Sequence, residues 1–146
     1  MTKKNKLSFV FLVIAVCFSG CAKEMVRWEK YSPEILEQAR HSGRPVAFDF
    51  YADWCKPCLK MKYDTFGDPE VAAALEPFAK IRADVTYRDK PGNREVQDTY
   101  RVNGIPQIIF FDAAGNELAG LRLQGFVNKK GLLDFLQKNH EVLFKK

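Results

Sequence analysis

Histidine and cysteine, which hold most structural metal ions in proteins, are scarce in this chain. Its 146 residues include two histidines, His41 and His140, and four cysteines. A structural zinc ion takes four ligands, and the two histidines stand near the two ends of the region expected to fold. A disulfide framework would need several cysteine pairs. The sequence therefore predicts neither a metal site, nor another cofactor, nor a disulfide-stapled scaffold.

A strong charge of one sign is missing as well. The formal net charge is +5, but Lys3, Lys4 and Lys6 supply three of the positive charges, and residues 1–20 hold no acid. Beyond that segment, 20 basic residues stand against 18 acidic ones. There is also no basic stripe with interleaved aromatic side chains, so nucleic acid is not an expected partner.

The overall composition is that of an ordinary globular protein. Apolar residues make up 47% of the chain and charged residues 28%, a balance that argues against disorder. The length fits one domain with a short N-terminal extension. No internal repeat is present, and nothing in the sequence demands more than a monomer.

The first twenty residues have the layout of an export signal. Lys3, Lys4 and Lys6 precede an apolar run over 7–18, which has the length of a signal core and is short for a membrane-spanning helix. Small residues then precede a cysteine, and the segment 18–21 (FSGC) resembles the lipobox of bacterial lipoproteins, with phenylalanine in place of the usual leucine. The resemblance implies that Cys21 is acylated and becomes the mature N-terminus.

This interpretation divides the chain into three parts. They are a lipoprotein signal peptide over 1–20, a lipid anchor and polar linker over 21–31, and a folded domain over 32–146. Fully extended, ten linker residues reach at most ~35 Å. The expected location is the periplasm, anchored to a membrane through lipid, and Ala22 favours the outer over the inner membrane. Ordinary signal cleavage and an uncleaved anchor remain as alternatives.

Helical and extended patterns alternate along the folded part. Strands are predicted over 45–51, 78–85, 106–111 and 118–126, the last two joined by a hairpin turn over 113–116. Helices are predicted to begin at Ser32, Cys55, Asp68, Asn93 and Asn128. The order predicts an α/β domain with a central sheet of about four strands, flanked by helices.

The segment 54–58 (WCKPC) directly follows the apolar strand over 45–51. A cysteine in the first turn of a helix faces unpaired backbone N–H groups and the positive end of the helix dipole, which both stabilise a thiolate. Lys56 adds a positive charge, and Pro57 costs no hydrogen bond in the first turn. Because the thiolate is the nucleophile of disulfide exchange, Cys55 is predicted to attack and Cys58, one turn later, to resolve the mixed disulfide.

Other interpretations of the two cysteines are a structural disulfide, half a zinc site, or a copper chaperone. Copper chaperones of the C-x-x-x-C type have three residues between their cysteines, and this chain has two. The position of the pair between a strand and a helix favours redox chemistry.

Two further features support this chemistry. Asp49 interrupts a buried strand, where a carboxylate is costly unless it has a task. It is predicted to accept the Cys58 proton, with its pKa raised by burial; a lysine partner or an outward-facing position are the alternatives. Pro106 opens an apolar strand, and a cis Ile105–Pro106 bond, adopted by about 5–6% of such bonds, would free the Ile105 backbone to pair with an extended substrate.

These segments resemble those of the thioredoxin-like superfamily. The segment 49–58 (DFYADWCKPC) resembles the thioredoxin active site, and 104–107 (GIPQ) resembles the cis-proline loop. Within the superfamily, 51–55, 65–71 and 84–86 are similar to the C-terminal periplasmic domain of DsbD, a transmembrane electron transporter. The similarity covers about residues 28–140.

The resemblance implies a thioredoxin fold, with a mixed central sheet, and a cis bond before Pro106. It also implies substrate binding by Trp54, Ile105 and Pro106, and a buried Asp49 that serves Cys58. The implied activity is reduction of oxidised periplasmic thiol proteins, with electrons taken from a membrane donor.

The chain departs from its relatives between and after the cysteines. Lys56 and Pro57 replace the Gly-Pro of thioredoxins and the Pro-His of the oxidant DsbA, and so are expected to tune the site. Lys62 stands where the DsbD domain carries an acidic residue. Two other functions therefore remain open: a disulfide oxidase or isomerase, and a redox-assisted binding factor in the assembly of cytochromes or metalloproteins.

Overall fold

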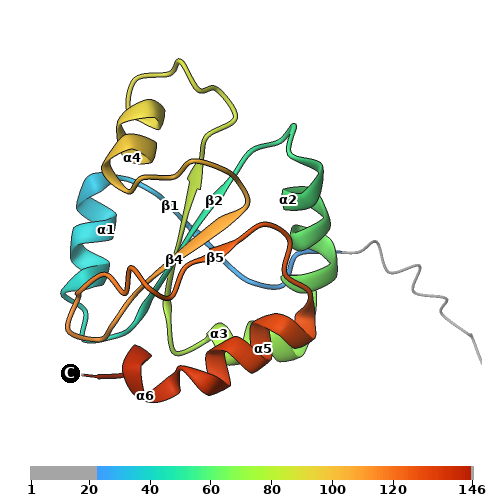
Figure 1. Cartoon of the computed structure of the whole chain (residues 1–146), viewed down its shortest axis with the longest axis vertical. Coiled ribbons are helices and arrows are strands. Elements are labelled where there is room, and N and C mark those ends of the chain that lie inside the picture. Colours follow the sequence, from blue (N-terminus) through green and yellow to red (C-terminus); the bar gives the residue numbers. More distant parts are fainter. Residues whose placement is uncertain (1–22, 146) are drawn as a thin grey trace, which may run out of the picture.

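Five strands form one mixed sheet in the order β1-β3-β2-β4-β5 (Figure 1). The computed structural model describes residues 23–145, so Cys21 and the predicted signal segment lie outside the described residues. The strands are β1 (Glu29–Lys30), β2 (Val46–Tyr51), β3 (Ala79–Asp84), β4 (Gln107–Phe111) and β5 (Leu123–Gln124). β1 and β2 run parallel to β3, whereas β4 runs antiparallel to β2 and β5 antiparallel to β4. The predicted mixed sheet flanked by helices is confirmed.

Capping side chains mark the start of several helices, as predicted. The helices are α1 (Pro33–Arg40), α2 (Lys56–Lys60), the π-helix η1 (Met61–Thr65), α3 (Pro69–Leu75), α4 (Asn93–Thr99), α5 (Lys129–Lys138) and α6 (His140–Leu143). The side chains of Ser32, Asp68 and Asn128 each accept a hydrogen bond from a backbone N–H in the first turn of α1, α3 and α5. Such caps satisfy donors that have no partner within the helix.

Helices cover both faces of the sheet. α1 and α4 lie on one side, and α2, η1, α3 and α5 lie on the other (Figure 1). Along β2, the side chains of Val46, Phe48 and Phe50 point to the first side, and those of Ala47 and Asp49 to the second. Because both faces are covered, β2 is apolar on both, and Asp49 is the exception on the side of α2.

The chain after β4 forms less strand than the sequence pattern predicts. Instead of a continuous strand over 118–126, there is one bridge between Phe111 and Glu117 and the two-residue β5. Between them, the Leu121 N–H donates to the Leu118 carbonyl over 2.8 Å. This turn contains Gly120 and carries the chain away from β4, so the prediction of an unbroken strand was wrong.

The segment 24–31, expected as part of a polar linker, lies against the domain. The backbone N–H groups of Met25 and Val26 donate to the Phe66 carbonyl over 2.8 and 3.0 Å, and Val26 is buried. β1 then pairs with β3, and the Tyr31 N–H donates to the Arg82 carbonyl over 2.9 Å. These contacts bring residues close to Cys21 in sequence onto the central sheet.

Candidate active site

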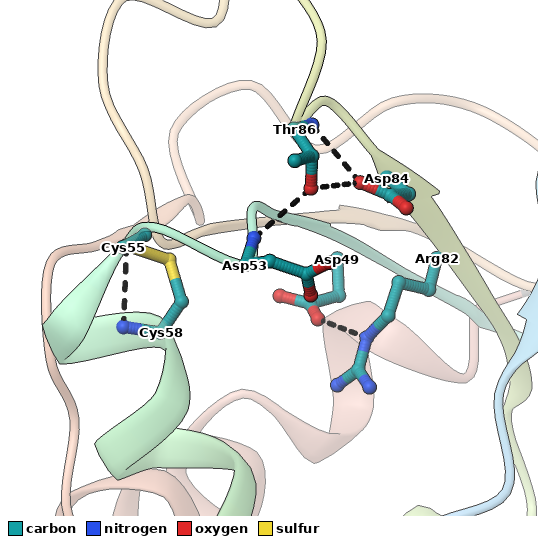
Figure 2. Close-up of a disulfide and its surroundings, with 7 residues drawn as sticks. All are labelled: Asp49, Asp53, Cys55, Cys58, Arg82, Asp84 and Thr86. Atoms are coloured by element: carbon teal, nitrogen blue, oxygen red, sulfur yellow. Dashed lines mark hydrogen bonds and ion pairs between the residues drawn. A yellow bond between two sulfur atoms is a disulfide. The ribbon is translucent and has the colours of Figure 1, made fainter.

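Cys55 and Cys58 form a disulfide at the start of α2 (Figure 2). Their Cα atoms lie 5.2 Å apart, and each residue is only 4% exposed. The Cys58 backbone N–H donates to Cys55 Sγ over 3.2 Å, which makes Cys55 the N-cap of the helix. A negative charge on that sulfur would thus meet a backbone donor and the positive end of the helix. Lys56 and Pro57 follow as the exposed first two residues of α2.

The loop before the cysteines is fixed by hydrogen bonds to Thr86. The Asp53 N–H donates to Thr86 Oγ1 over 3.0 Å, and the Trp54 indole N–H donates to the Thr86 carbonyl over 2.9 Å. Thr86 is held in turn by its N–H and hydroxyl groups, which both donate to Asp84 Oδ1. Trp54 is therefore held in place although it is 64% exposed.

The bond between Ile105 and Pro106 is cis, as the resemblance implies. Pro106 is buried, and Ile105 packs against the hydrophobic cluster that contains both cysteines. Trp54 and Ile105 line a shared groove of about 420 Å³, together with Arg88, Arg94 and other residues. The structure thus brings Trp54 and the cis-proline loop together beside the disulfide.

Asp49 is buried within the sheet, with 1% of its surface exposed. Its Oδ2 accepts a hydrogen bond from Arg82 Nε over 2.6 Å, and Figure 2 shows the carboxylate pointing toward this guanidinium. Oδ1 has no hydrogen-bond partner among the described residues. Burial raises the pKa of the Asp49 carboxyl above its ordinary value, although Arg82 opposes the rise. An outward-facing Asp49 is excluded, and its partner is an arginine rather than a lysine.

Arg82, Thr86 and Glu24 are site residues that the sequence analysis missed. Arg82 is flanked by the buried Ile81 and Ala83, but the strand alternates charged and apolar residues, with Lys80 and Asp84 on either side, so this charge carries no signal like that of Asp49. Glu24 pairs with Arg82 across 2.7 Å. No local pattern marks Glu24, because its role depends on how the N-terminal segment folds onto β3.

Within residues 23–145, no group of three or more His, Cys, Asp and Glu side chains is placed to hold a metal ion. None of the helices in this part combines the length and the apolar character that a membrane crossing requires.

The geometry defines a class of protein. A dithiol that closes reversibly into a disulfide carries two electrons. Here it stands at a helix start, with a groove beside it and a buried carboxylate on the same side of the sheet. The chain is a thiol–disulfide oxidoreductase built on the thioredoxin fold.

Comparisons with known proteins agree with this class. A family model described as "Thioredoxin-like domain" matches residues 32–140. The thiol:disulfide interchange protein DsbD of Vibrio vulnificus is 41% identical over 103 residues, which are 70% of this chain and 17% of that protein. The chain therefore matches only a small part of this relative.

Solved structures of thioredoxin-like proteins are also similar to this chain. The reduced C-terminal domain of Neisseria meningitidis DsbD is 27% identical with a TM-score of 0.63, covering 76% of this chain and 99% of that domain. A thioredoxin from Thermus thermophilus is 30% identical with a TM-score of 0.60, covering 80% of this chain and 86% of that one. The chain belongs to the family of thioredoxin-like domains, and its relatives include the C-terminal domain of DsbD.

Proposed function

We propose that the chain is a periplasmic, lipid-anchored disulfide reductase that acts on exported proteins. The observation that carries this proposal is the Cys55–Cys58 pair at the start of α2, in a domain 41% identical to part of a thiol:disulfide interchange protein. The reducing direction rests on the resemblance to the DsbD domain set out above.

The reaction begins with both cysteines reduced. The Cys55 thiolate attacks one sulfur of a substrate disulfide, a mixed disulfide forms, and the other substrate sulfur leaves as a thiolate. The N-terminal position of Cys55 supports this role, because the helix start favours the thiolate that attacks. Lys56 adds positive charge beside it.

Cys58 completes the exchange. Its thiol loses a proton, and the resulting thiolate attacks Cys55 Sγ and releases the second substrate sulfur. Two electrons pass to the substrate, and Cys55 and Cys58 are left as a disulfide. Asp49 is the proposed proton acceptor, because burial raises the pKa of its carboxyl and so favours the protonated form. Oδ1 is free of hydrogen bonds among the described residues, and so is open to a proton.

The substrate docks beside the disulfide. Trp54 presents an exposed ring, and the backbone of Ile105, next to Pro106, is proposed to pair with an extended segment of the substrate. The groove between them, about 420 Å³ in volume, gives room for side chains next to the substrate cysteine. The partners are therefore oxidised thiol proteins of the periplasm, bound by a monomeric domain.

Each turnover must be followed by re-reduction. The bacterial periplasm is kept oxidising, so the Cys55–Cys58 disulfide needs electrons from a membrane protein with its own dithiol. That dithiol would reduce the pair by the same exchange in the opposite direction. An anchor at Cys21 would keep the domain near this donor. Labelling with a radioactive fatty acid tests the anchor: the wild type should be labelled and Cys21→Ser should not, while membrane fractionation tests the preference for the outer membrane.

The reduction potential of the Cys55–Cys58 pair tests the proposed direction. It is measured by equilibration with glutathione and with thioredoxin, followed by alkylation and peptide mass spectrometry, which distinguishes this pair from Cys17 and Cys21. A value of about −270 mV, as in thioredoxin, together with reduction of insulin, supports the reductase. A value of about −120 mV, as in DsbA, without insulin reduction would overturn it.

One observation favours an oxidase or isomerase instead. The exposed Lys56 stands directly after Cys55, whose sulfur also accepts the Cys58 N–H. Both features stabilise the thiolate, and a stabilised thiolate makes the disulfide more oxidising. Complementation of a strain that lacks its disulfide oxidase would support this function.

A further inference from the structure

Glu24 is tied to the domain by two side-chain contacts. Its Oε1 accepts a hydrogen bond from the Trp28 indole N–H over 2.9 Å and pairs with the Arg82 NH1 group across 2.7 Å. The Glu24 side chain is only 16% exposed. The neighbouring N–H groups of Met25 and Val26 donate to the Phe66 carbonyl. Glu24 is therefore held in place and does not belong to a loose tail.

The Arg82 guanidinium is shared between two carboxylates. Nε donates to Asp49 over 2.6 Å, while NH1 pairs with Glu24. The guanidinium carbon lies 4.6 Å from the centre of the Trp28 ring and 5.0 Å from that of Tyr51. The Arg82 side chain is 12% exposed. The Arg82 guanidinium is thus largely buried against aromatic rings and pairs with both carboxylates.

We infer that Glu24 is a positioning residue that acts through Arg82 and sets how readily Asp49 takes up the Cys58 proton. This inference rests on the proposed function, since it concerns the proton acceptor of the same exchange reaction. The N-terminal segment was expected to be part of a linker. Through Glu24 it would instead be connected directly to the redox site.

The electrostatics give the direction of the effect. The charged groups that influence Asp49 are Arg82 from β3 and Glu24 from the N-terminal segment. On β4 the residue paired with Asp49 is the apolar Ile108, and α2 contributes Cys58. The negative charge of Glu24 raises the pKa of Asp49, against the effect of Arg82. Removing that charge should leave Arg82 to stabilise the Asp49 carboxylate, and a lower pKa makes Asp49 a weaker proton acceptor.

The position of Glu24 in the sequence places this connection close to the predicted lipid anchor. Only Ala22 and Lys23 separate it from Cys21. If Cys21 carries the lipid, the residue that influences the proton acceptor lies three positions from the membrane anchor.

The experiment measures the titration of Asp49 separately from the reduction of insulin. Full-length protein in detergent, labelled with ¹³C at aspartate carboxyl groups, is titrated by NMR, and Asp49→Asn identifies the Asp49 signal. Glu24→Gln is the main variant, because it is isosteric and keeps an acceptor for Trp28; Glu24→Ala is the second variant. Glu24→Asp tests rescue by charge. Glu37→Gln is the matched control, since Glu37 forms an exposed ion pair with Arg40.

We expect Glu24→Gln and Glu24→Ala to lower the Asp49 titration midpoint by about half a pH unit. The inflection in the pH profile of insulin reduction should move by the same amount. Glu24→Asp should restore most of the shift, and Glu37→Gln should leave both midpoints unchanged. An Asp49 midpoint that stays in place in both Glu24 variants overturns the inference. If the wild type fails to reduce insulin but the NMR midpoint still moves with Glu24, the proposed function fails and the connection between Glu24 and Asp49 stands.

Discussion

Asp49 and Arg82 stand opposite each other on the parallel strands β2 and β3, and their side chains form a buried ion pair of 2.6 Å. Both point to the side of the sheet that α2 covers. The pair explains how a carboxylate is tolerated in the central strand, because a buried charge is stable only with a partner. It also leaves Oδ1 of Asp49 unpaired among the described residues, which keeps the carboxyl responsive to pH.

Asp49→Asn should change the pH dependence of stability. Burial raises the pKa of the native carboxyl, so the native state binds more protons than the unfolded state at pH values above about 3.9, the ordinary aspartate pKa. The free energy of unfolding of the wild type should therefore fall as the pH rises through the interval between the unfolded and native pKa values. The variant has no carboxyl to titrate and should gain stability relative to the wild type as the pH rises. Arg82 keeps Glu24 as a partner in the variant, so no charge is left alone.

Urea unfolding of the oxidised protein between pH 4 and pH 8 measures this difference. Glu37→Gln serves as a control with an exposed carboxylate. A stability difference between Asp49→Asn and the wild type that is constant with pH would contradict a raised pKa at this position.

Arg82→Met should be far more harmful than loss of an exposed cation. It would leave the buried Asp49 and the largely buried Glu24 without their shared partner, and the cost of breaking a buried pair is about 3–5 kcal/mol. The loss should be smaller at pH 4.5 than at pH 7.5, because protonation removes the uncompensated charges. Lys130→Met is the control: its pair with Asp134 is exposed, and about 0.5 kcal/mol is expected. Equal losses in the two variants would show that the Arg82 network adds nothing.

Sequence reasoning succeeded where the structure depends on local signals. The caps at Ser32, Asp68 and Asn128 and the helix start at Cys55 follow from short-range hydrogen bonding, and the sequence around each is sufficient. The cis bond before Pro106 followed from the family resemblance alone, since the residues themselves favour the trans form.

Sequence reasoning failed where the structure depends on which segments become neighbours. The turn that interrupts the strand over 118–126 and the attachment of β1 to β3 both depend on the assembled sheet. The ion pair of Arg82 with Asp49 requires the parallel register of two strands more than thirty residues apart. No local pattern could reveal it, because Asp49 stood out in its apolar strand but Arg82 lies among other charged residues in β3.

Thr86→Val should loosen the loop that presents Trp54. The variant keeps the shape of the side chain but loses the hydroxyl that accepts from the Asp53 N–H and donates to Asp84. Loss of these bonds should cost about 1–2 kcal/mol of stability. Because Trp54 belongs to the proposed docking surface, KM for insulin should rise more than kcat falls. Steady-state kinetics and Trp54 fluorescence quenching measure the two effects, and a fall in kcat with unchanged KM would contradict the docking role.

Gly67→Ala should destabilise the end of η1. An added Cβ would lie 2.2 Å from the Tyr63 carbonyl oxygen and 3.2 Å from that of Lys23. The backbone must shift to accept it, at a cost of about 1–3 kcal/mol. Gly120→Ala is the matched control, because nothing lies within 4 Å of an added Cβ there. Thermal unfolding of both variants measures this difference in stability. Similar melting temperatures for the two variants would contradict the crowding at Gly67.

The two cysteines should differ when each is replaced by serine in the reduced protein. With Cys58→Ser, Cys55 can still attack a substrate disulfide, but no thiol remains to resolve the product, so a mixed disulfide should accumulate. With Cys55→Ser, Cys58 lacks the N-cap position that stabilises a thiolate, and at least tenfold less adduct is expected, as for a free-energy difference of about 1.4 kcal/mol. Non-reducing gels and peptide mass spectrometry identify the adduct and its cysteine. The double variant shows any background from Cys17 and Cys21. Preferential trapping by Cys55→Ser would reverse the assignment of attacking and resolving thiols.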